Sequence, residues 1–388
     1  MTLQQQLEDV LPKGHTFRVL HVQSEPKQCT NLIKYGSEHS AASKPQLTIK
    51  IKHFLLVISS DNLVLFGIEV YNYFTVAEIN TQYLFVSKVD TTGLTDLKIN
   101  ANKLINRFLQ SLISINHTSL TYRVKSPKSS TIKKINKLLS PSKPSYRTVQ
   151  LSDKFITKVS LFTKSSNQYF FPESSKNLHK HLIDGDKLLR WWLQLIDDTL
   201  ADSQVKFTKK LMIPGSHSPH PYLLSGWELG SVFGENQRAV YNIPSFPDDP
   251  KTRFLEFLVV ENRVKLKLPE FYEELGFRQE FRLGNVVGII GCESEVMSSS
   301  PDMGARYEPV VLSNKQYKQL IKVIKSEDFS ICDDVRLLVN TKLPFFLRLH
   351  HKSFEYSYLC GKYEHSKVSK STVVQVNNLS GLVRKKKK

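Results

Sequence analysis

The stretch IKHFLLVISSDNLVLFGIEVYNYFTV, residues 51–76, decides the fold class of this 388-residue chain. Two runs rich in β-branched and aromatic residues, Ile51–Ser59 and Leu63–Val76, lie on either side of the polar turn signal SSDN. Such a pattern is typical of an antiparallel β-hairpin. A third run, YLFVSKVD (Tyr83–Asp90), has the same character. We therefore expect a sheet to begin here.

Helices are expected to cover this sheet. Apolar residues recur at helical spacing in residues 100–115, 186–200 and 313–325. Phe155–Lys164 has the pattern of another strand, and the glycine spacing of RLGNVVGIIG (Arg282–Gly291) favours a strand with close backbone approach over a nucleotide loop. We see no internal repeat. The order of elements predicts an α+β fold, with a central mixed β-sheet surrounded by helices in one domain that spans residues 1–388.

The composition is that of a folded protein with a basic surface. The chain has 54 Lys and Arg against 36 Asp and Glu, a formal charge of +18 that attracts nucleic acids, anionic cofactors or acidic proteins. The four cysteines lack CxxC spacing and the histidine pairs lack supporting carboxylates, so we expect no disulfide framework and no metal site. Acids at the N-terminus and the lack of a long apolar run argue against secretion and against a membrane span.

Two segments concentrate the positive charge. Residues 124–147 are rich in Ser, Pro and Lys and contain no acid, so we expect a basic, mostly disordered insertion. The basic C-terminal tail, residues 366–388, ends in LVRKKKK (Leu382–Lys388). Such a run suits nuclear import or contact with polyanions, and it is equally typical of a solvated, frayed terminus.

The motif FPDDPKTRF, Phe246–Phe254, allows two interpretations. Asp249 followed by Pro250 is an ordinary N-cap with proline at the first helical position, which predicts a helix to about residue 262. That interpretation leaves the second acid, Asp248, and the following Lys251 unexplained. The two carboxylates could instead form an acidic patch that attracts a cationic substrate, with one of them accepting a proton from an amine.

The tryptophan pair at 191–192 also allows two interpretations. Helical periodicity puts Trp192 in the middle of a core stripe and Trp191 at its edge. A tryptophan at the mouth of a pocket could also pack on an adenine, a pantetheine arm or the stem of a lysine.

Four segments together resemble one protein family. FVSKVDTTG (Phe85–Gly93), LFTKSSNQYFFPESSKN (Leu161–Asn177), KHLIDGDKLLRWW (Lys180–Trp192) and AVYNIPSFPDDPKTRF (Ala239–Phe254) occur in the order and chemistry of fungal histone H3 lysine acetyltransferases of replication-coupled nucleosome assembly. That family is a distant structural relative of the metazoan CBP-type acetyltransferases. The resemblance runs from the first hairpin to about residue 262. It implies one catalytic domain with a central mixed sheet and acetyl-CoA as the acetyl donor.

The resemblance also implies site residues. Asp249 becomes the candidate proton acceptor, Asp248 its acidic neighbour and Lys251 a buried lysine that the enzyme acetylates on itself. Asp90 helps to shape the reaction centre, and Tyr169 and Trp192 flank the substrate lysine. The acetyl-CoA groove is expected to be lined by Val89, Asp90, Thr91, Lys98, Ile99, Asn100, Ala101, Asn102, Phe162, Ser166, His181, Leu182, Ile183 and Trp191.

The implied function is acetylation of newly synthesised histone H3, presented with H4, in the nucleus. Expected partners are histone chaperones of the anti-silencing-function and nucleosome-assembly-protein types, with neither a membrane nor direct DNA binding required. A lysine ammonium must first lose a proton, because its reference pKa is about 10.4. The rival interpretation, supported by the +18 charge, is a non-enzymatic chromatin or nucleic-acid binding protein. The sequence does not select the H3 lysine, the true general base or the group that stabilises the oxyanion.

Overall fold

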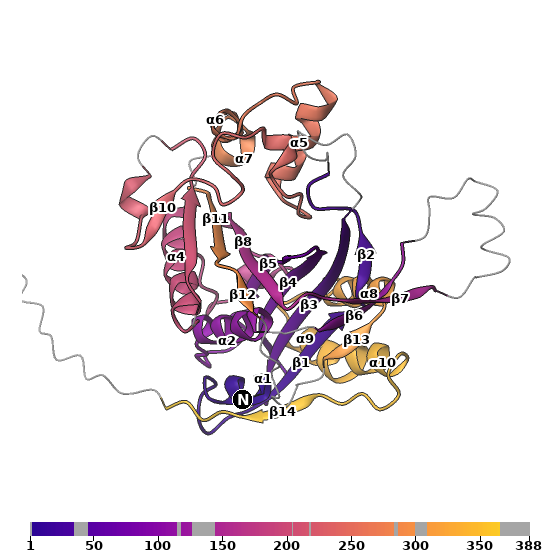
Figure 1. Cartoon of the computed structure of the whole chain (residues 1–388). Helices are drawn as coiled ribbons and strands as arrows, with labels where there is room; N and C mark the ends of the chain where they lie inside the picture. Colours follow the sequence, from indigo (N-terminus) through magenta and orange to yellow (C-terminus); the bar gives the residue numbers. More distant parts are fainter. Residues whose placement is uncertain are drawn as a thin grey trace, which may run out of the picture.

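The computed structural model describes residues 2–34, 46–114, 118–125, 144–203, 205–216, 219–282, 286–298 and 309–364 (Figure 1). The strands are β1 (Thr16–Ser24), β2 (Lys27–Cys29), β3 (Leu47–Ser59), β4 (Val64–Val76), β5 (Asn80–Thr91), β6 (Ser119–Arg123), β7 (Tyr146–Gln150), β8 (Lys154–Thr163), β9 (Phe207–Met212), β10 (Trp227–Leu229), β11 (Gly288–Ser294), β12 (Met297–Ser298), β13 (Val310–Leu312) and β14 (Ser357–Cys360). The α-helices are α1 (Leu3–Glu8), α2 (Ala101–Ile113), α4 (Gly185–Ala201), α5 (Pro250–Val260), α6 (Leu268–Gly276), α7 (Gln279–Arg282), α8 (Asn314–Ile324), α9 (Cys332–Leu337) and α10 (Leu343–Arg348).

These strands form one mixed sheet, as the sequence predicts. Its order is β10-β9-β11-β8-β5-β4-β3-β2-β6-β7, and β1 pairs with β3, β13 and β14. The expected hairpin is β3–β4, and Asn62 in its turn has a φ of 64°, a left-handed conformation that asparagine tolerates. Within the described residues, none of the helices is long and apolar enough to cross a membrane.

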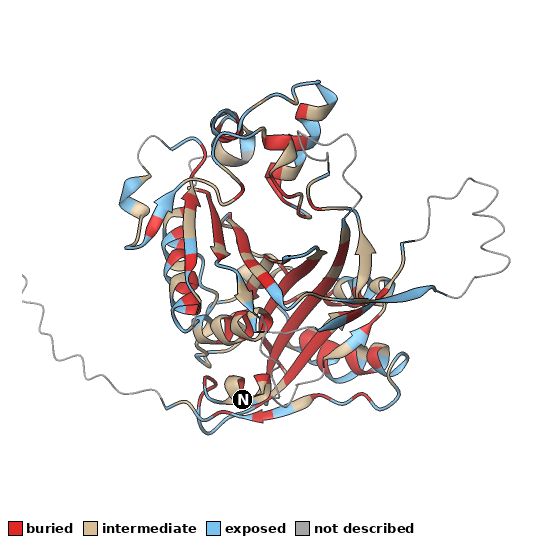
Figure 2. Cartoon of the chain, in the orientation of Figure 1, coloured by how far each residue is buried: buried red, intermediate tan, exposed pale blue. Residues whose placement is uncertain are grey.

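Helices bury both faces of the central strands (Figure 2). On one face α1, α2 and α4 pack against a core that includes Leu55, Ile68 and Val86. On the other face α8, α9 and α10 pack against Phe54 and Leu56. Successive side chains of a strand point to opposite faces, and both faces are covered here, so β3 and β4 are buried almost throughout. A separate cluster holds α5 and α6 together at one end of the sheet, at the top of Figure 1.

Two of the expected helices begin at capping side chains. Asn100 accepts a hydrogen bond from the Lys103 N–H at the start of α2, and Ser313 does the same for Gln316 at the start of α8. In each case the side chain satisfies one of the N–H groups that a helix leaves unpaired.

The two basic segments lie largely outside the described residues, and the structure revises the bounds of the first. Two paired strands flank the expected insertion of residues 124–147: β6 ends at Arg123, and β7 begins at Tyr146, inside the expected bounds. Residues 126–143, and the C-terminal tail from residue 365, lie outside the described residues. The glycine segment is β11 from Gly288 onward, where a side chain on Gly288 would collide with Leu189.

The parallel pair in the middle of the sheet separates before its strands end. β5 and β8 pair from Asn80↔Phe155 to Val86↔Leu161. Beyond that point β5 continues to Thr91 beside β4 alone, while β8 continues to Thr163 beside β11. Backbone N–H and C=O groups on the facing edges are thereby released from the ladder at a single place in the sheet. The residues of the candidate site converge there.

Candidate active site

The FPDDPK motif lies over strand β5 where the parallel pair separates. The ring of Phe246 stacks on Phe85, with centroids 4.5 Å apart and planes at 6°. The carboxylate of Asp248 lies 3.4 Å from Nζ of Lys88, three residues further along β5. An aromatic stack and an ion pair therefore fix the start of α5 against the sheet.

The two acids of the motif have different environments. Asp248 has a φ of 58° and an exposed side chain. Asp249 is 1% exposed and is the N-cap of α5, where Oδ1 accepts the Lys251 N–H at 3.0 Å. Its other oxygen, Oδ2, accepts a hydrogen bond from Nζ of Lys251 at 2.5 Å. Asp249 therefore caps the helix, as the first interpretation predicts, and it also pairs with a lysine of the same motif.

Lys251 is completely buried, and so is its ion pair. The side chains of Lys251 and Asp249 are both 0% exposed. The ring centroid of Phe246 is 6.0 Å from the ammonium, and the neighbouring Tyr272 hydroxyl donates to Ser231 at 3.0 Å. Burial raises the pKa of Tyr272 well above its usual value, with a smaller contribution from Asp249. Each charge of a buried ion pair is stabilised by the other. If one charge is neutralised, the other stays buried without a partner, which destabilises the folded state.

The Asp90 carboxylate binds backbone N–H groups and a buried lysine. Its Oδ2 accepts the backbone N–H groups of Tyr169, Phe170 and Phe171 at 2.8, 2.9 and 3.3 Å. Its Oδ1 lies 2.5 Å from Nζ of Lys180, and this ion pair is almost fully buried. These contacts leave the Asp90 carboxylate occupied, and they hold the segment after β8 against the end of β5. The geometry gives Asp90 a positioning role.

Lys180 is the site residue that sequence reasoning missed. Besides Asp90, its ammonium donates to the Thr91 carbonyl at 2.5 Å and to the Ser174 hydroxyl at 3.0 Å. Gly93 permits this approach, since a side chain there would meet the Lys180 backbone N at 2.3 Å. Its partner lies 90 residues away in the sequence, so no local pattern could have shown the pair.

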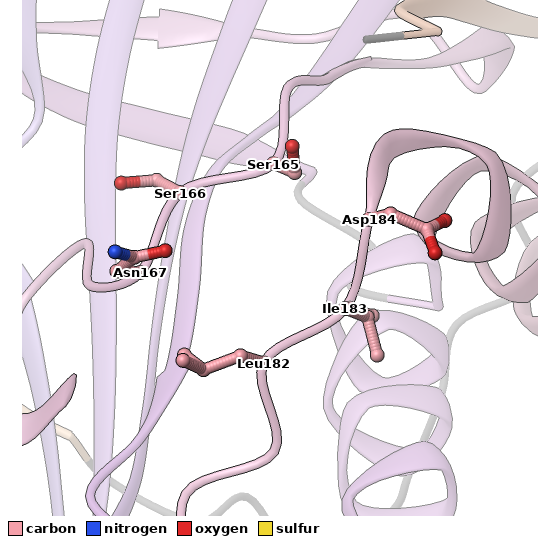
Figure 3. Close-up of a pocket in the computed structure, with 6 residues that line it drawn as sticks. All are labelled: Ser165, Ser166, Asn167, Leu182, Ile183 and Asp184. Atoms are coloured by element: carbon pink, nitrogen blue, oxygen red, sulfur yellow. The ribbon is translucent and has the colours of Figure 1, made fainter. Parts of the chain in front are cut away.

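A cavity of about 350 Å³ opens beside this segment (Figure 3). Two short loops line it, Ser165–Asn167 after β8 and Leu182–Asp184 before α4. Three of the expected cofactor residues, Ser166, Leu182 and Ile183, therefore surround one space, and His181 is next to them in the chain. At the far end Asp184 caps α4 by accepting the Lys187 N–H.

Trp191 links α4 to the start of α2. Its indole Nε1–H donates to Oδ1 of Asn102 at 2.7 Å. This contact joins two of the expected cofactor segments, residues 98–102 and Trp191. Val89 and Thr91 lie at the nearby end of β5, where Val89 and Ile99 pack against the same core.

Three other expected site residues have contacts of their own. Trp192 is 7% exposed and belongs to the core between the sheet and α4, as its periodicity indicated. Phe162 packs on Phe281 and the α5–α6 cluster. The Tyr169 hydroxyl donates to the Lys164 carbonyl at 2.5 Å, and burial raises its pKa to about 12, so it stays protonated near neutral pH. Among the described residues, no group of three or more His, Cys, Asp and Glu is arranged to hold a metal ion.

Comparison with known proteins identifies the family. The family model for the histone acetyltransferase KAT11-type domain matches residues 3–344. The chain belongs to the KAT11-type histone acetyltransferases. The resemblance to the fungal H3 acetyltransferases is thereby confirmed, and the rival interpretation as a non-enzymatic binding protein is set aside.

Several fungal proteins are similar to this KAT11-type chain. It is 33% identical over 353 residues to histone acetyltransferase RTT109 of Candida albicans, covering 83% of this chain and 94% of that protein. It is 29% identical over 344 residues to histone acetyltransferase rtt109 of Aspergillus flavus, covering 73% of this chain and 54% of that protein. The crystal structure of Rtt109 from Aspergillus fumigatus has a TM-score of 0.71 at 24% identity and covers 94% of this chain and 100% of that one, which shows the shared fold. As an acetyltransferase of this family, the chain uses acetyl-CoA as a substrate.

Proposed function

We propose that the enzyme transfers the acetyl group of acetyl-CoA to lysines of newly synthesised histone H3, with its reaction centre at Asp248, Asp249 and Lys251. The observation that carries this proposal is the fully buried Asp249–Lys251 pair at the point where β5 and β8 separate. A carboxylate in that position can accept a proton from an amine in a site that is closed to bulk water. An N-cap on the protein surface is open to solvent.

The proton transfer and the bond changes balance as follows. The substrate lysine gives one ammonium proton to Asp249, directly or through a water molecule. Its amine then attacks the thioester carbonyl carbon, a C–N bond forms, the C–S bond breaks, and the second proton reaches the sulfur of coenzyme A. The products are an acetyl-lysine, the free thiol and the proton on Asp249, which returns to solvent.

The acetyl-CoA site is proposed to run from the end of β5, through residues 98–102 and Trp191, to the 350 Å³ cavity. Replacing Ser166 by tyrosine should fill that cavity and raise KM for acetyl-CoA several-fold, with a smaller effect on kcat. Ser119→Tyr, at an exposed serine of β6, is the control. Equal KM values for the two variants in initial-rate assays with varied acetyl-CoA would place the cofactor elsewhere.

Self-acetylation of Lys251 is proposed as an activating step. Acetylation removes the ammonium that holds Oδ2 of Asp249, so the carboxylate becomes available to the substrate while the new amide stays compatible with a buried site. Without this step the base of the reaction remains neutralised by its own neighbour.

Substitutions of Lys251 separate its charged and neutral states. Lys251→Gln, a neutral mimic, should retain more activity than Lys251→Arg, whose wider guanidinium keeps its charge in a fully buried space. We expect a several-fold difference in initial rates, and an acetyl group on Lys251 in peptide maps of the wild-type enzyme. An unmodified Lys251 together with a fully active Lys251→Arg enzyme would rule out the activating step.

The proposed partners are H3–H4 and histone chaperones of the anti-silencing-function and nucleosome-assembly-protein types, in the nucleus. The basic sequence of residues 126–143 and the RKKKK tail suit acidic docking surfaces. Deleting either segment should leave Lys251 acetylation intact and reduce chaperone-stimulated H3 acetylation, measured side by side. Unchanged stimulation in both deletions would show that chaperones dock on another surface.

A further inference from the structure

A second cavity lies beside the FPDDPK motif. It has a volume of about 440 Å³ and lies between the motif, the segment Cys29–Lys34 and strands β3 and β4. Both Asp248 and Asp249 line it, opposite Lys50 and Tyr73. The acidic residues of the proposed reaction centre therefore share one space with a lysine from the central sheet.

Lys50 is the first of several lysines on that face of the sheet. Lys50 and Lys52 lie on β3, directly opposite Tyr73 and Tyr71 of β4. The Lys50 ammonium is 4.4 Å from the ring centroid of Tyr71, and the Lys52 ammonium is 5.0 Å from the same centroid. Tyrosine faces hold both ammonium groups without neutralising them, since a cation–π contact leaves the charge in place.

Lys88 and Lys325 extend this row towards the motif. Lys88 lies on β5 beside Asp248, and its positive charge contributes to lowering the pKa of Lys325. Lys325 follows α8 directly and lies 5.5 Å from the ring centroid of Phe170. We call Lys50, Lys52, Lys88 and Lys325 the lysine row.

The lysine row carries more positive charge than its neighbours balance. Among the described residues, Glu69 and Asp248 are the carboxylates that interact with these four ammonium groups. Glu69 is buried and also accepts the Tyr317 hydroxyl at 3.0 Å. Burial, followed by Lys52, lowers the pKa of Lys50 to about 8, and burial followed by Lys88 lowers that of Lys325. An added carboxylate would relieve this repulsion.

We propose that the lysine row binds a glutamate or aspartate side chain of the protein substrate, close in sequence to the acceptor lysine. The inference rests on the proposed reaction centre and specifies its substrate class: acceptor segments that carry a carboxylate, in preference to purely basic ones. Asp248 and Asp249 attract the acceptor ammonium, and the lysine row, on the same face, repels a second cation and attracts an anion. This order of opposite charges would fix the register of a bound peptide. Peptides with a different charge order would bind more weakly.

The experiment uses peptides with a single lysine in which one glutamate is moved along the flanking positions, each matched by a glutamine peptide. For the wild-type enzyme, at least one position should give about a tenfold lower KM with glutamate than with glutamine, which corresponds to ~1.4 kcal/mol. Lys50→Met and Lys52→Met keep an apolar stem over Tyr71 and should abolish the difference without weakening the glutamine peptide. Lys50→Glu should instead favour lysine or arginine at that position.

The results distinguish this inference from the proposed function. Acetylation of Lys251, read in the same runs, reports whether acetyl transfer is intact. If the wild-type enzyme acetylates glutamate and glutamine peptides equally at every position, the inference is wrong and the reaction centre stands. If no peptide shows a preference but polyglutamate inhibits the wild-type enzyme and not Lys50→Met, the row binds an acidic partner protein instead.

On H3–H4, the inference predicts that the most heavily acetylated H3 lysine has a carboxylate nearby in the sequence. In Lys50→Met, acetylation should be distributed more evenly among the H3 lysines.

Discussion

Asp249→Ala is expected to abolish most histone acetylation and to lower the free energy of unfolding by about 3–5 kcal/mol, since it leaves the completely buried Lys251 ammonium without its partner. It also removes the acceptor for the Lys251 N–H at the start of α5. Urea unfolding and initial rates of acetyl transfer to H3–H4 measure the two effects.

Asp248→Asn is the matched control for the stability effect. Asp248 is adjacent in the chain, but its side chain is 74% exposed, and asparagine tolerates the left-handed φ of 58°. Its unfolding free energy should stay within about 0.5 kcal/mol of the wild type. An Asp249→Ala enzyme as stable as Asp248→Asn would contradict the buried ion pair.

The second large effect is expected at Asp90. Asp90→Ala removes the acceptor of three backbone N–H groups and the partner of Lys180, which should cost several kcal/mol of stability. The loss should also expose residues 164–183 to proteases, because the Asp90 carboxylate holds that segment. Adding Lys180→Met to Asp90→Ala should recover part of the stability, because it removes the unpaired buried ammonium. The backbone N–H groups would still lack their acceptor.

Lys176→Met provides the comparison for this site. Lys176 pairs with Glu173 in the same segment, with side chains 63% and 44% exposed. Exposed pairs contribute about 0–1 kcal/mol, so this variant should unfold close to the wild type. Equal proteolysis of Asp90→Ala and wild-type enzyme would show that the segment is held by other contacts.

Local sequence patterns were sufficient for most of the fold. The hairpin β3–β4, helix α2 with its Asn100 cap and helix α8 with its Ser313 cap all lie within four residues of their expected bounds. β6 and β7 were not predicted, because each has only five residues and they lie on either side of the basic segment. Their place in the sheet depends on β2, which is far away in the sequence.

The candidate site was only partly predictable. Asp249 was recognised as a cap because capping is a local signal, but a lysine at the second helical position is usually exposed, and nothing local shows that Lys251 is buried. Its burial depends on Phe246 stacking on Phe85 and on the packing of α5 with α6. Asp90 was expected to shape the reaction centre, whereas its contacts with Lys180 and the segment after β8 depend on tertiary structure.

The most direct test of the reaction centre is the rate of acetyl transfer to H3–H4 by Asp249→Asn in a Lys251→Gln background. The glutamine removes the buried ammonium, so the second substitution no longer leaves a cation unpaired. It removes the carboxylate that Lys251→Gln leaves without its partner, so the double variant should be at least as stable as Lys251→Gln alone and should bind acetyl-CoA equally well. The account predicts a rate at least about tenfold lower than that of Lys251→Gln, or ~1.4 kcal/mol of barrier, because the proton acceptor is missing. Equal rates in the two enzymes would contradict it and reduce Asp249 to the counterion of Lys251.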